Sequence, residues 1–403
     1  MRVLEIESLK DAQQIMREIK VDPYGIKIMA PKAIKYAVRI NSLSNIAANI
    51  LKQEMLSLGA DVAVSRNALT GKTRSTDCLL MANLSQLNRL NEKLNKQPFG
   101  LGKLAAALSS AIGNYQKNDF SLDLGGYKLK LGRRACVMGI VNLTPDSFSG
   151  DGLYSRAHSL RFMAVADIVR HVEKMVEDGA DIIDVGGESS RPGAKPVSVK
   201  EELSRTVPVI KLLAKKIKVP ISIDTRKPEV ARSALDNGAL MVNDISGLRN
   251  PKMARLVAKY RAAAVIMHMK GSPRTMQNNP VYKSLIDEII AYLEKALNRA
   301  VSFGVDREKI ILDPGIGFGK TAEHNLEILK QLKALKALGR PILVGPSRKS
   351  FIGKILNAAA QERGSGTLSA SLLAIKNGAK IVRVHEVRQV KQALKVLDAI
   401  SNI

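Results

Sequence analysis

The chain has 403 residues, of which 45% are hydrophobic and 25% charged, as is ordinary for a globular protein in water. No run of about 18 apolar residues occurs, so we expect no membrane-spanning segment. The start of the chain carries Glu5 and Glu7 where a secretory signal would need a basic patch and an apolar core. The only cysteines are Cys78 and Cys136, which argues against a disulfide framework and favours a cytoplasmic location.

The chain is strongly basic, with 63 Lys and Arg against 37 Asp and Glu and a formal net charge of +26. Nucleic acid is one partner class that such a charge suits. The lysines are spread along the chain, aromatic residues make up 4% and Trp is absent, which leaves few platforms for base stacking. We therefore expect no nucleic-acid partner. The alternative interpretation is a lysine-rich surface without a specific partner, whose charge could still draw an anionic small substrate toward the site.

The first 130 residues are predicted to form a small α/β accessory domain, and they show no constellation of chemical groups. Gly59 supplies a helix stop after a stretch with helical periodicity. Residues Asp119–Lys130 are predicted to form a hairpin or linker that leads into the second domain. The other expected elements are helices Leu43–Leu58 and Asn83–Leu94 and strands Asp61–Ser65 and Cys78–Ala82.

Residues 131–403 contain eight short apolar runs that end in polar or charged residues, with helix-like stretches between them. Eight strands that alternate with helices match a (β/α)8 barrel, a fold of about 250 residues. The predicted fold is therefore a TIM barrel preceded by a smaller α/β domain. The eight runs are Val137–Thr144, Ile182–Ser189, Ile221–Thr225, Met241–Gly247, Ala264–Met269, Ile310–Gly319, Ile342–Arg348 and Ile381–Glu386.

The carboxyl ends of barrel strands meet on one face, and that face carries the chemistry. Taken singly, each polar residue at a strand end has an ordinary explanation as a cap, a turn amide or a solvated charge. Their shared placement at strand ends is what favours a common site. The residues expected to converge are Asn142, Arg191, Asp224, Asn243, Asp313, Lys349, Arg383 and His385.

Two of the strand ends have the character of anion sites. Gly345–Ser350 runs into a helix start, where backbone amides favour negative charge. Arg383 and His385 alternate along the last strand, which puts them on the same face. Gly315–Thr321 resembles the end of a phosphate-binding loop, but Pro314 occupies the required upstream glycine position, so that interpretation fails.

Five motifs in order resemble the dihydropteroate synthases, a family of pterin-binding barrels. The resemblance covers about residues 133–400. The motifs are Asn142–Ser149, Gly186–Gly193, Asp313–Lys320, Ser347–Ser350 and Arg383–His385. That family joins 4-aminobenzoate to 6-hydroxymethyl-7,8-dihydropterin diphosphate and releases pyrophosphate on the folate pathway.

The resemblance implies roles for residues of these motifs and for three residues outside them, Asp224, Asn243 and Met267. It implies that Asp313 accepts the main donor pair of the pterin. Asn142 is implied as the protein ligand of Mg²⁺, an ion that prefers oxygen ligands. Around the ring, it implies that Asn243 and Asp224 complete the polar contacts and that Lys349 binds a ring acceptor. Met267 and Phe318 are implied as apolar walls. Arg383 is implied to stack on the pterin and face the diphosphate, which His385 holds.

For 4-aminobenzoate the resemblance implies contacts from loops 1 and 2 and from the helix after strand 7. These residues are Phe148, Ser190, Arg191, Pro192 and Ser350. We expect ionisation of the carbon–oxygen bond to diphosphate, followed by attack of the amine, with no enzyme nucleophile. A homodimer is implied by the resemblance alone.

Two departures from the usual family pattern stand out. Loop 1 places Gly150 before Asp151 where the family order is Ser-Asp-Gly-Gly, and Ser190 stands where Thr is common. Two rivals stay open: a methyltetrahydrofolate-dependent corrinoid methyltransferase on a related barrel, and a non-catalytic pterin-binding or nucleic-acid-binding protein.

Overall fold

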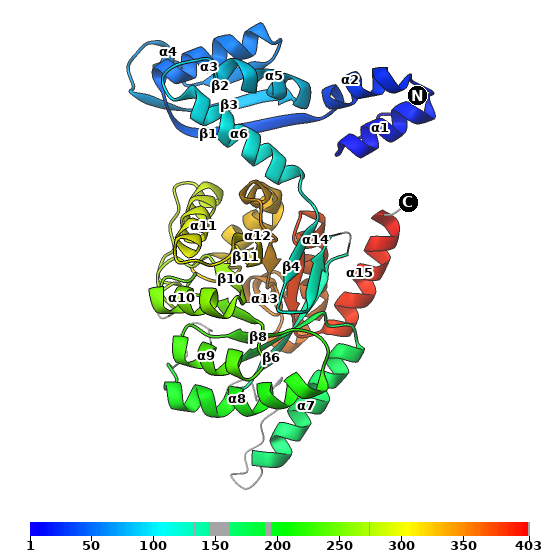
Figure 1. Cartoon of the computed structure of the whole chain (residues 1–403), viewed down its shortest axis with the longest axis vertical. Coiled ribbons are helices and arrows are strands. Elements are labelled where there is room, and N and C mark those ends of the chain that lie inside the picture. The colour runs from blue at the N-terminus through cyan, green and yellow to red at the C-terminus, as the bar shows by residue number, and fades with distance from the viewer. Residues whose placement is uncertain (133, 145–160, 190–194, 274, 402–403) are drawn as a thin grey trace. The chain divides into compact units, whose positions relative to one another are not determined.

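The computed structural model describes residues 1–132, 134–144, 161–189, 195–273 and 275–401. The chain forms two compact units, Met1–Gln116 and Lys117–Ile403, both drawn in Figure 1. Among the described residues, none of the helices combines the length and the hydrophobicity that crossing a bilayer requires.

The N-terminal unit contains an antiparallel sheet in the order β1-β3-β2. The strands are β1 (Lys35–Ser44), β2 (Asp61–Val64) and β3 (Ser75–Asn83), and the helices are α1 (Leu9–Glu18), α2 (Pro23–Ala33), α3 (Asn45–Ser57), α4 (Arg66–Leu69), α5 (Leu84–Leu94) and α6 (Leu101–Gln116). Strand β3 alternates strictly between exposed and buried residues, so it presents one face to a core shared with α3, α5 and α6. The predicted helices and strands of this unit are confirmed, but β1, α1, α2, α4 and α6 were not predicted.

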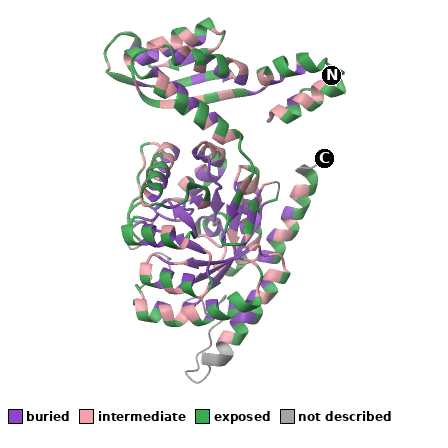
Figure 2. Cartoon of the chain, viewed as in Figure 1, coloured by how far each residue is buried: buried purple, intermediate pink, exposed green. Residues whose placement is uncertain are grey.

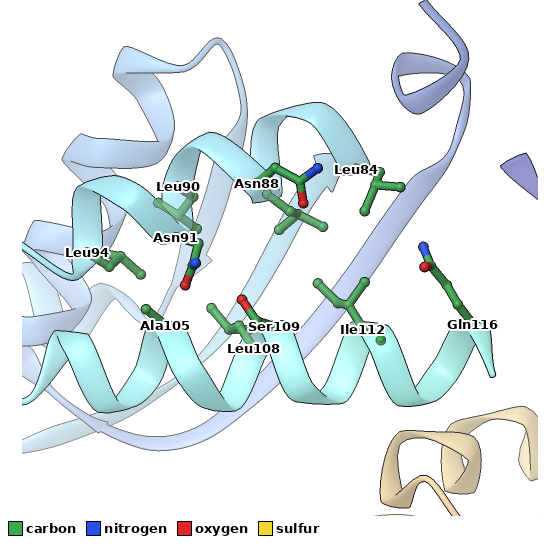
Figure 3. A pocket seen from close by; sticks show the side chains of 12 residues that line it. Leu84, Asn88, Leu90, Asn91, Leu94, Ala105, Leu108, Ser109, Ile112 and Gln116 are labelled. Atoms are coloured by element: carbon green, nitrogen blue, oxygen red, sulfur yellow. The ribbon is translucent and has the colours of Figure 1, made fainter. Parts of the chain in front are cut away.

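Between α5 and α6 lies a cavity of about 160 Å³, shown in Figure 3. Leu90, Leu94 and Leu108 contribute apolar surface, and Asn91 and Ser109 contribute polar atoms. The Oδ1 atom of Asn91 is buried and has no hydrogen-bond partner among the described residues. The two helices are therefore incompletely packed at this point.

The second unit is a parallel sheet of eight strands in the order β11-β10-β9-β8-β7-β6-β13-β12. A parallel bridge between Leu312 and Ile342 joins the two ends of this order, which closes the sheet into a barrel. The (β/α)8 prediction is confirmed. The strands are β6 (Cys136–Asn142), β7 (Ile182–Gly186), β8 (Ile221–Asp224), β9 (Met241–Asp244), β10 (Ala263–Met267), β11 (Ile310–Asp313), β12 (Leu343–Val344) and β13 (Ile381–Val384).

Helices surround the barrel and cover the outer side of its strands (Figure 1). Figure 2 shows that the strands are buried, while the helices expose one side and bury the other. Such strands are buried on both faces and therefore appear in the sequence as continuous apolar runs. The helices are α7 (Arg161–Glu177), α8 (Val199–Lys216), α9 (Pro228–Asp236), α10 (Pro251–Tyr260), α11 (Leu285–Ser302), α12 (Ala322–Gln331), α13 (Ser350–Leu356), α14 (Gly364–Lys376) and α15 (Val387–Ser401).

A hairpin of β4 (Phe120–Asp123) and β5 (Lys128–Leu131) packs against the amino ends of the barrel strands. Its four leucines, which are at most 3% exposed, share an apolar cluster with Met138 and Ile182. The predicted hairpin is therefore present, but it belongs to the barrel. The two compact units divide after Gln116, earlier than the domain boundary expected at residue 130, because these leucines close the amino end of the barrel.

Candidate functional site

Strand register places three of the expected residues, Asn142, Asp224 and Asn243, on one rung of the barrel. Asn142 pairs with Gly186, Gly186 with Asp224, and Asp224 with Asn243. The rung lies at the carboxyl ends of β6 to β9. Because Gly186 carries no side chain, the space between its neighbours stays open: a Cβ there would lie 3.7 Å from both Asn142 Oδ1 and Asp224 Oδ2.

Arg383, near the end of β13, is held between two carboxylates from other strands. Its Nε donates to Asp184 Oδ2 at 2.6 Å, and its Nη2 donates to Asp224 Oδ2 at 2.8 Å. The same Asp184 oxygen accepts from Asn243 Nδ2 at 3.0 Å. Asp184 thus joins residues from β9 and β13, and it is completely buried.

This network shifts the pKa values of its members. Burial raises the pKa of Asp224 to about 7, against the attraction of Arg383 and with repulsion from Asp184. Glu202 and Asp244 are further carboxylates that raise it. Burial lowers the pKa of Arg383, but Asp184 and Asp224 outweigh that effect and raise it overall, so the guanidinium stays charged.

Asp313 ends β11 and is buried beside a glycine-rich turn. Its Oδ1 accepts from the Gly315 amide at 2.7 Å. Burial raises the pKa of Asp313 to about 6. The groups that act in the opposite direction are the Gly315 amide, Lys349, Lys320 and Arg383. At neutral pH the group is therefore a carboxylate that can accept hydrogen bonds from a ligand.

An apolar wall lies beside Asp313. Met267 pairs with Asp313 across β10 and β11, and it shares a buried cluster with Phe318. The other members of the cluster, Ile245, Met269 and Met276, were not predicted. The Nζ atom of Lys349 lies 4.2 Å from the centre of the Phe318 ring, so the expected ring-binding cation and the expected apolar wall are neighbours.

The turn after β11 needs glycine. Gly315 has φ +70°, and a Cβ there would lie 2.0 Å from the carbonyl oxygen of His268. Gly317 has φ +81°, and a Cβ there would lie 3.0 Å from Lys349 Cδ. Glycine at these positions lets the backbone approach both the neighbouring strand end and Lys349.

His385 is oriented by the segment after β12. Its Nδ1 lies 2.9 Å from Ser347 Oγ, which also accepts from the His385 amide at 3.3 Å. Ser347 further donates to Glu386 Oε2 at 3.3 Å, and Glu386 pairs with Arg348 at 2.5 Å. Lys349 is the N-cap of α13, and Ser350 is its first residue. The expected anion-binding residues therefore lie together around the ends of β12 and β13.

The described residues of the site offer a metal ion few protein ligands. Asn142 Oδ1, beside Gly186, is an oxygen ligand of the kind that Mg²⁺ accepts. Among the described residues no three His, Cys, Asp or Glu side chains form a metal-binding group. An ion here would therefore depend on oxygens of a bound substrate.

Four predicted residues, Phe148, Ser190, Arg191 and Pro192, lie outside the described residues, as does the exchanged Gly150 and Asp151 pair. On the described part of loop 2, Glu188 accepts from the Val197 amide at 3.2 Å. It also pairs with Arg226 and Lys227, each at 3.2 Å.

Sequence reasoning missed Asp184, Ser347 and Lys320. The signal for Asp184 was a lone carboxylate inside the apolar run Ile182–Gly186, where an unpaired charge would be costly. Ser347 and Lys320 both lie inside recognised motifs, but nothing in the sequence indicated which residues they contact in the fold.

Comparisons with known proteins place the barrel of this chain among the pterin-binding enzymes. The family described as pterin binding enzyme matches residues 138–385. A dihydropteroate synthase of Synechocystis is 49% identical over 281 residues, covering 69% of this chain and 94% of the relative. The solved structure of Xanthomonas albilineans dihydropteroate synthase with 4-aminobenzoic acid has a TM-score of 0.65 and 39% identity, covering 71% of this chain and all of that one.

One further relative aligns with both units. A probable bifunctional folylpolyglutamate synthase/dihydropteroate synthase of Halobacterium salinarum is 41% identical over 396 residues. The alignment covers 98% of this chain and 46% of the relative, so this chain corresponds to about half of that protein. The N-terminal unit therefore has a counterpart in that relative.

Proposed function

This chain belongs to the dihydropteroate synthases of the pterin-binding enzyme family, and on that premise we propose the part that each site residue plays. The reaction joins 4-aminobenzoate to 6-hydroxymethyl-7,8-dihydropterin diphosphate, forming 7,8-dihydropteroate and pyrophosphate for folate biosynthesis. The observation that carries the assignment of roles is the meeting of Arg383, Asp184, Asp224 and Asn243 at the carboxyl ends of four strands.

Asp313 and Asn243 supply the polar contacts to the pterin. The pyrimidinone edge of a pterin presents adjacent N–H donors and lone pairs, which a carboxylate and an amide can match. Lys349 binds a ring acceptor, and its position over Phe318 brings it to the same side of the site as the apolar wall. Met267 and Phe318 cover the flat faces of the ring.

Arg383 and His385 receive the diphosphate. The planar guanidinium of Arg383 can stack on the pterin while its charge faces the leaving group. Its two carboxylate partners fix that orientation before the substrate arrives. Ser347 fixes the ring of His385 in the same way.

Asn142 would hold a Mg²⁺ ion through its amide oxygen, with the diphosphate supplying further oxygens. An ion bound there would neutralise part of the diphosphate charge.

The chain's own residues favour ionisation of the pterin–diphosphate bond. The carbon–oxygen bond breaks with its electron pair on the departing diphosphate oxygen. Arg383 and His385 stabilise that charge, while Asp224 and Asp313 stabilise the resonance-delocalised pterin cation. The amine nitrogen of 4-aminobenzoate then bonds to the exocyclic carbon and loses a proton to solvent.

The aminobenzoate contacts fall on Ser350 and on Phe148, Ser190, Arg191 and Pro192. Ser350 begins α13, where backbone amides favour a carboxylate. We also propose that the protein is cytoplasmic and forms a homodimer. Size-exclusion chromatography with light scattering tests the dimer.

A pyrophosphate-release assay with and without 4-aminobenzoate tests the function. Release that depends on both substrates supports it. A corrinoid methyltransferase would release no pyrophosphate and would consume methyltetrahydrofolate. A non-catalytic pterin-binding protein would bind the pterin diphosphate without turnover.

A further inference from the structure

A buried lysine lies behind the site and has no part in the roles assigned above. Lys320 follows the glycine-rich turn after β11 and is only 3% exposed. Its Nζ lies 2.9 Å from His268 Nδ1, 3.0 Å from the Phe318 carbonyl oxygen and 3.5 Å from the His268 carbonyl oxygen. These three partners are neutral, and none of them is a carboxylate.

The geometry indicates which group carries the protons. An ammonium has three donors, and three acceptors surround this one. Burial, followed by the charges of Lys320 and Arg249, lowers the pKa of His268 to about 2. His268 is therefore neutral and accepts at Nδ1, and its ring packs edge-on against Tyr292 with the centroids 4.8 Å apart.

The charge that attracts this ammonium is that of Asp313. Burial lowers the pKa of Lys320 to about 7, while Asp313 raises it and Lys349 lowers it. In return, Lys320 is one of three cations that oppose the effect of burial on Asp313. The other two, Lys349 and Arg383, are assigned to the substrates, which leaves Lys320 as the cation assigned to the protein alone.

We propose that Lys320 is a positioning residue for the pterin: its buried amino group ties the Gly315–Gly319 turn to His268 and, in the protonated form that prevails where Asp313 titrates, acts as a counter-charge for Asp313. The inference rests on the proposed function, because it presumes that Asp313 binds the pterin as a carboxylate. One bond reaches the carbonyl of Phe318, so the same group also fixes the residue that forms the apolar wall.

A purely structural role would be served as well by an apolar side chain. Burying an ammonium among neutral acceptors has a desolvation cost, which an apolar residue of similar length avoids, although it leaves the acceptors without this donor. Lys320→Met is therefore expected to keep the fold while removing the charge. Lys320→Gln removes the charge but keeps a donor for a carbonyl oxygen.

The sign of the effect on Asp313 follows from the charge. Without Lys320 the carboxylate loses an attraction, so the pKa of Asp313 rises further above its usual range. The acidic limb of kcat/KM for pterin diphosphate then moves to higher pH, by about one unit. The charged groups that still act on Asp313 are Lys349 and Arg383.

The experiment compares wild type, Lys320→Met, Lys320→Gln and a matched control. The control is Lys380→Met. Lys380 is half-buried and, like Lys320, donates to a backbone carbonyl, that of Gly132 at 3.0 Å, but it precedes β13 at the opposite end of the barrel. We measure the pH profile of kcat/KM by pyrophosphate release and the affinity for pterin diphosphate by calorimetry without 4-aminobenzoate. Circular dichroism monitors folding.

The expected result is an acidic limb shifted upward in both Lys320 variants, with affinity for pterin diphosphate at least tenfold weaker in Lys320→Met. Lys320→Gln recovers part of the affinity for pterin diphosphate, but its acidic limb stays at the higher pH. The control variant changes neither the affinity nor the position of the limb. An unshifted limb in both folded variants overturns the proposal, even if affinity falls. If Lys320→Met does not fold, the limb of Lys320→Gln decides alone. Absence of turnover in the wild type would overturn the proposed function itself.

Discussion

Replacement of Asp184 by asparagine removes one charge from the centre of the site and leaves the side-chain volume almost unchanged. Asp184 is completely buried, and one of its oxygens accepts from both Arg383 and Asn243. The substitution therefore tests whether this carboxylate holds residues of different strands together. The new amide can still accept one of these hydrogen bonds.

The magnitude follows from the contacts that remain. Removing one partner of a buried ion pair costs about 3–5 kcal/mol, because the other charge stays buried. Arg383 keeps Asp224 at 2.8 Å, so we expect the lower value, about 3 kcal/mol. A guanidinium that shifts by about 1 Å lowers kcat/KM on the order of 100-fold.

The control is Asp181→Asn, the same substitution three residues earlier. Asp181 pairs with Lys391 at 2.7 Å, but the side chains are 31% and 23% exposed. Such partly exposed pairs contribute about 0–1 kcal/mol. Urea unfolding followed by circular dichroism gives the free energy for the barrel transition, and pyrophosphate release gives kcat/KM. Equal losses of stability in the two variants, or wild-type kcat/KM in Asp184→Asn, would refute the reasoning.

Two further predictions concern the backbone and the domain boundary. Gly315→Ala should destabilise the barrel by about 3 kcal/mol or more in urea unfolding, since φ is +70° and the new Cβ would overlap a backbone oxygen at 2.0 Å. Gly364→Ala, with no atom within 4 Å of its Cβ, should be neutral, and equal losses would contradict this account. A fragment of residues 117–403 should melt cooperatively and release pyrophosphate, whereas 132–403 should not fold, because it lacks four leucines whose burial contributes about 1.5–3 kcal/mol each. A folded and active 132–403 fragment would show that the hairpin is dispensable.

The barrel could be predicted because its strands are buried on both faces and end in polar residues. The runs starting at Ile182, Ile221 and Met241 are followed by helix-like stretches, and each forms a strand. The limits of the runs were less informative. Strand β12 has only two residues, because the rest of its predicted run, up to Arg348, forms the turn that orients His385.

The N-terminal unit was harder to predict. Strand β1 alternates between exposed and half-buried residues, such as Arg39 and Ile40, so its pattern of hydrophobicity is weak. Helix α6 is rich in Ala, Ser and Gly and has little contrast between its faces. Both elements depend on the core that they share with α3 and α5, and local sequence does not reveal such tertiary packing.

The positions of the site residues followed from the strand ends, but their partners did not. Strand order in a barrel brings Asp224 and Asn243 onto one rung, which a sequence can suggest. The link from Asp184 to Arg383 joins residues 199 positions apart, and the link from Lys320 to His268 spans 52. Such pairs depend on side-chain direction and burial, which only the folded chain determines.

The most direct test of the central claim is dihydropteroate formation by the full chain with and without the Asp313 carboxylate. Pterin diphosphate and 4-aminobenzoate are supplied together, and product is followed by chromatography. The account predicts product with wild type and none above background with a folded Asp313→Ala variant. Wild-type turnover in Asp313→Ala would contradict it.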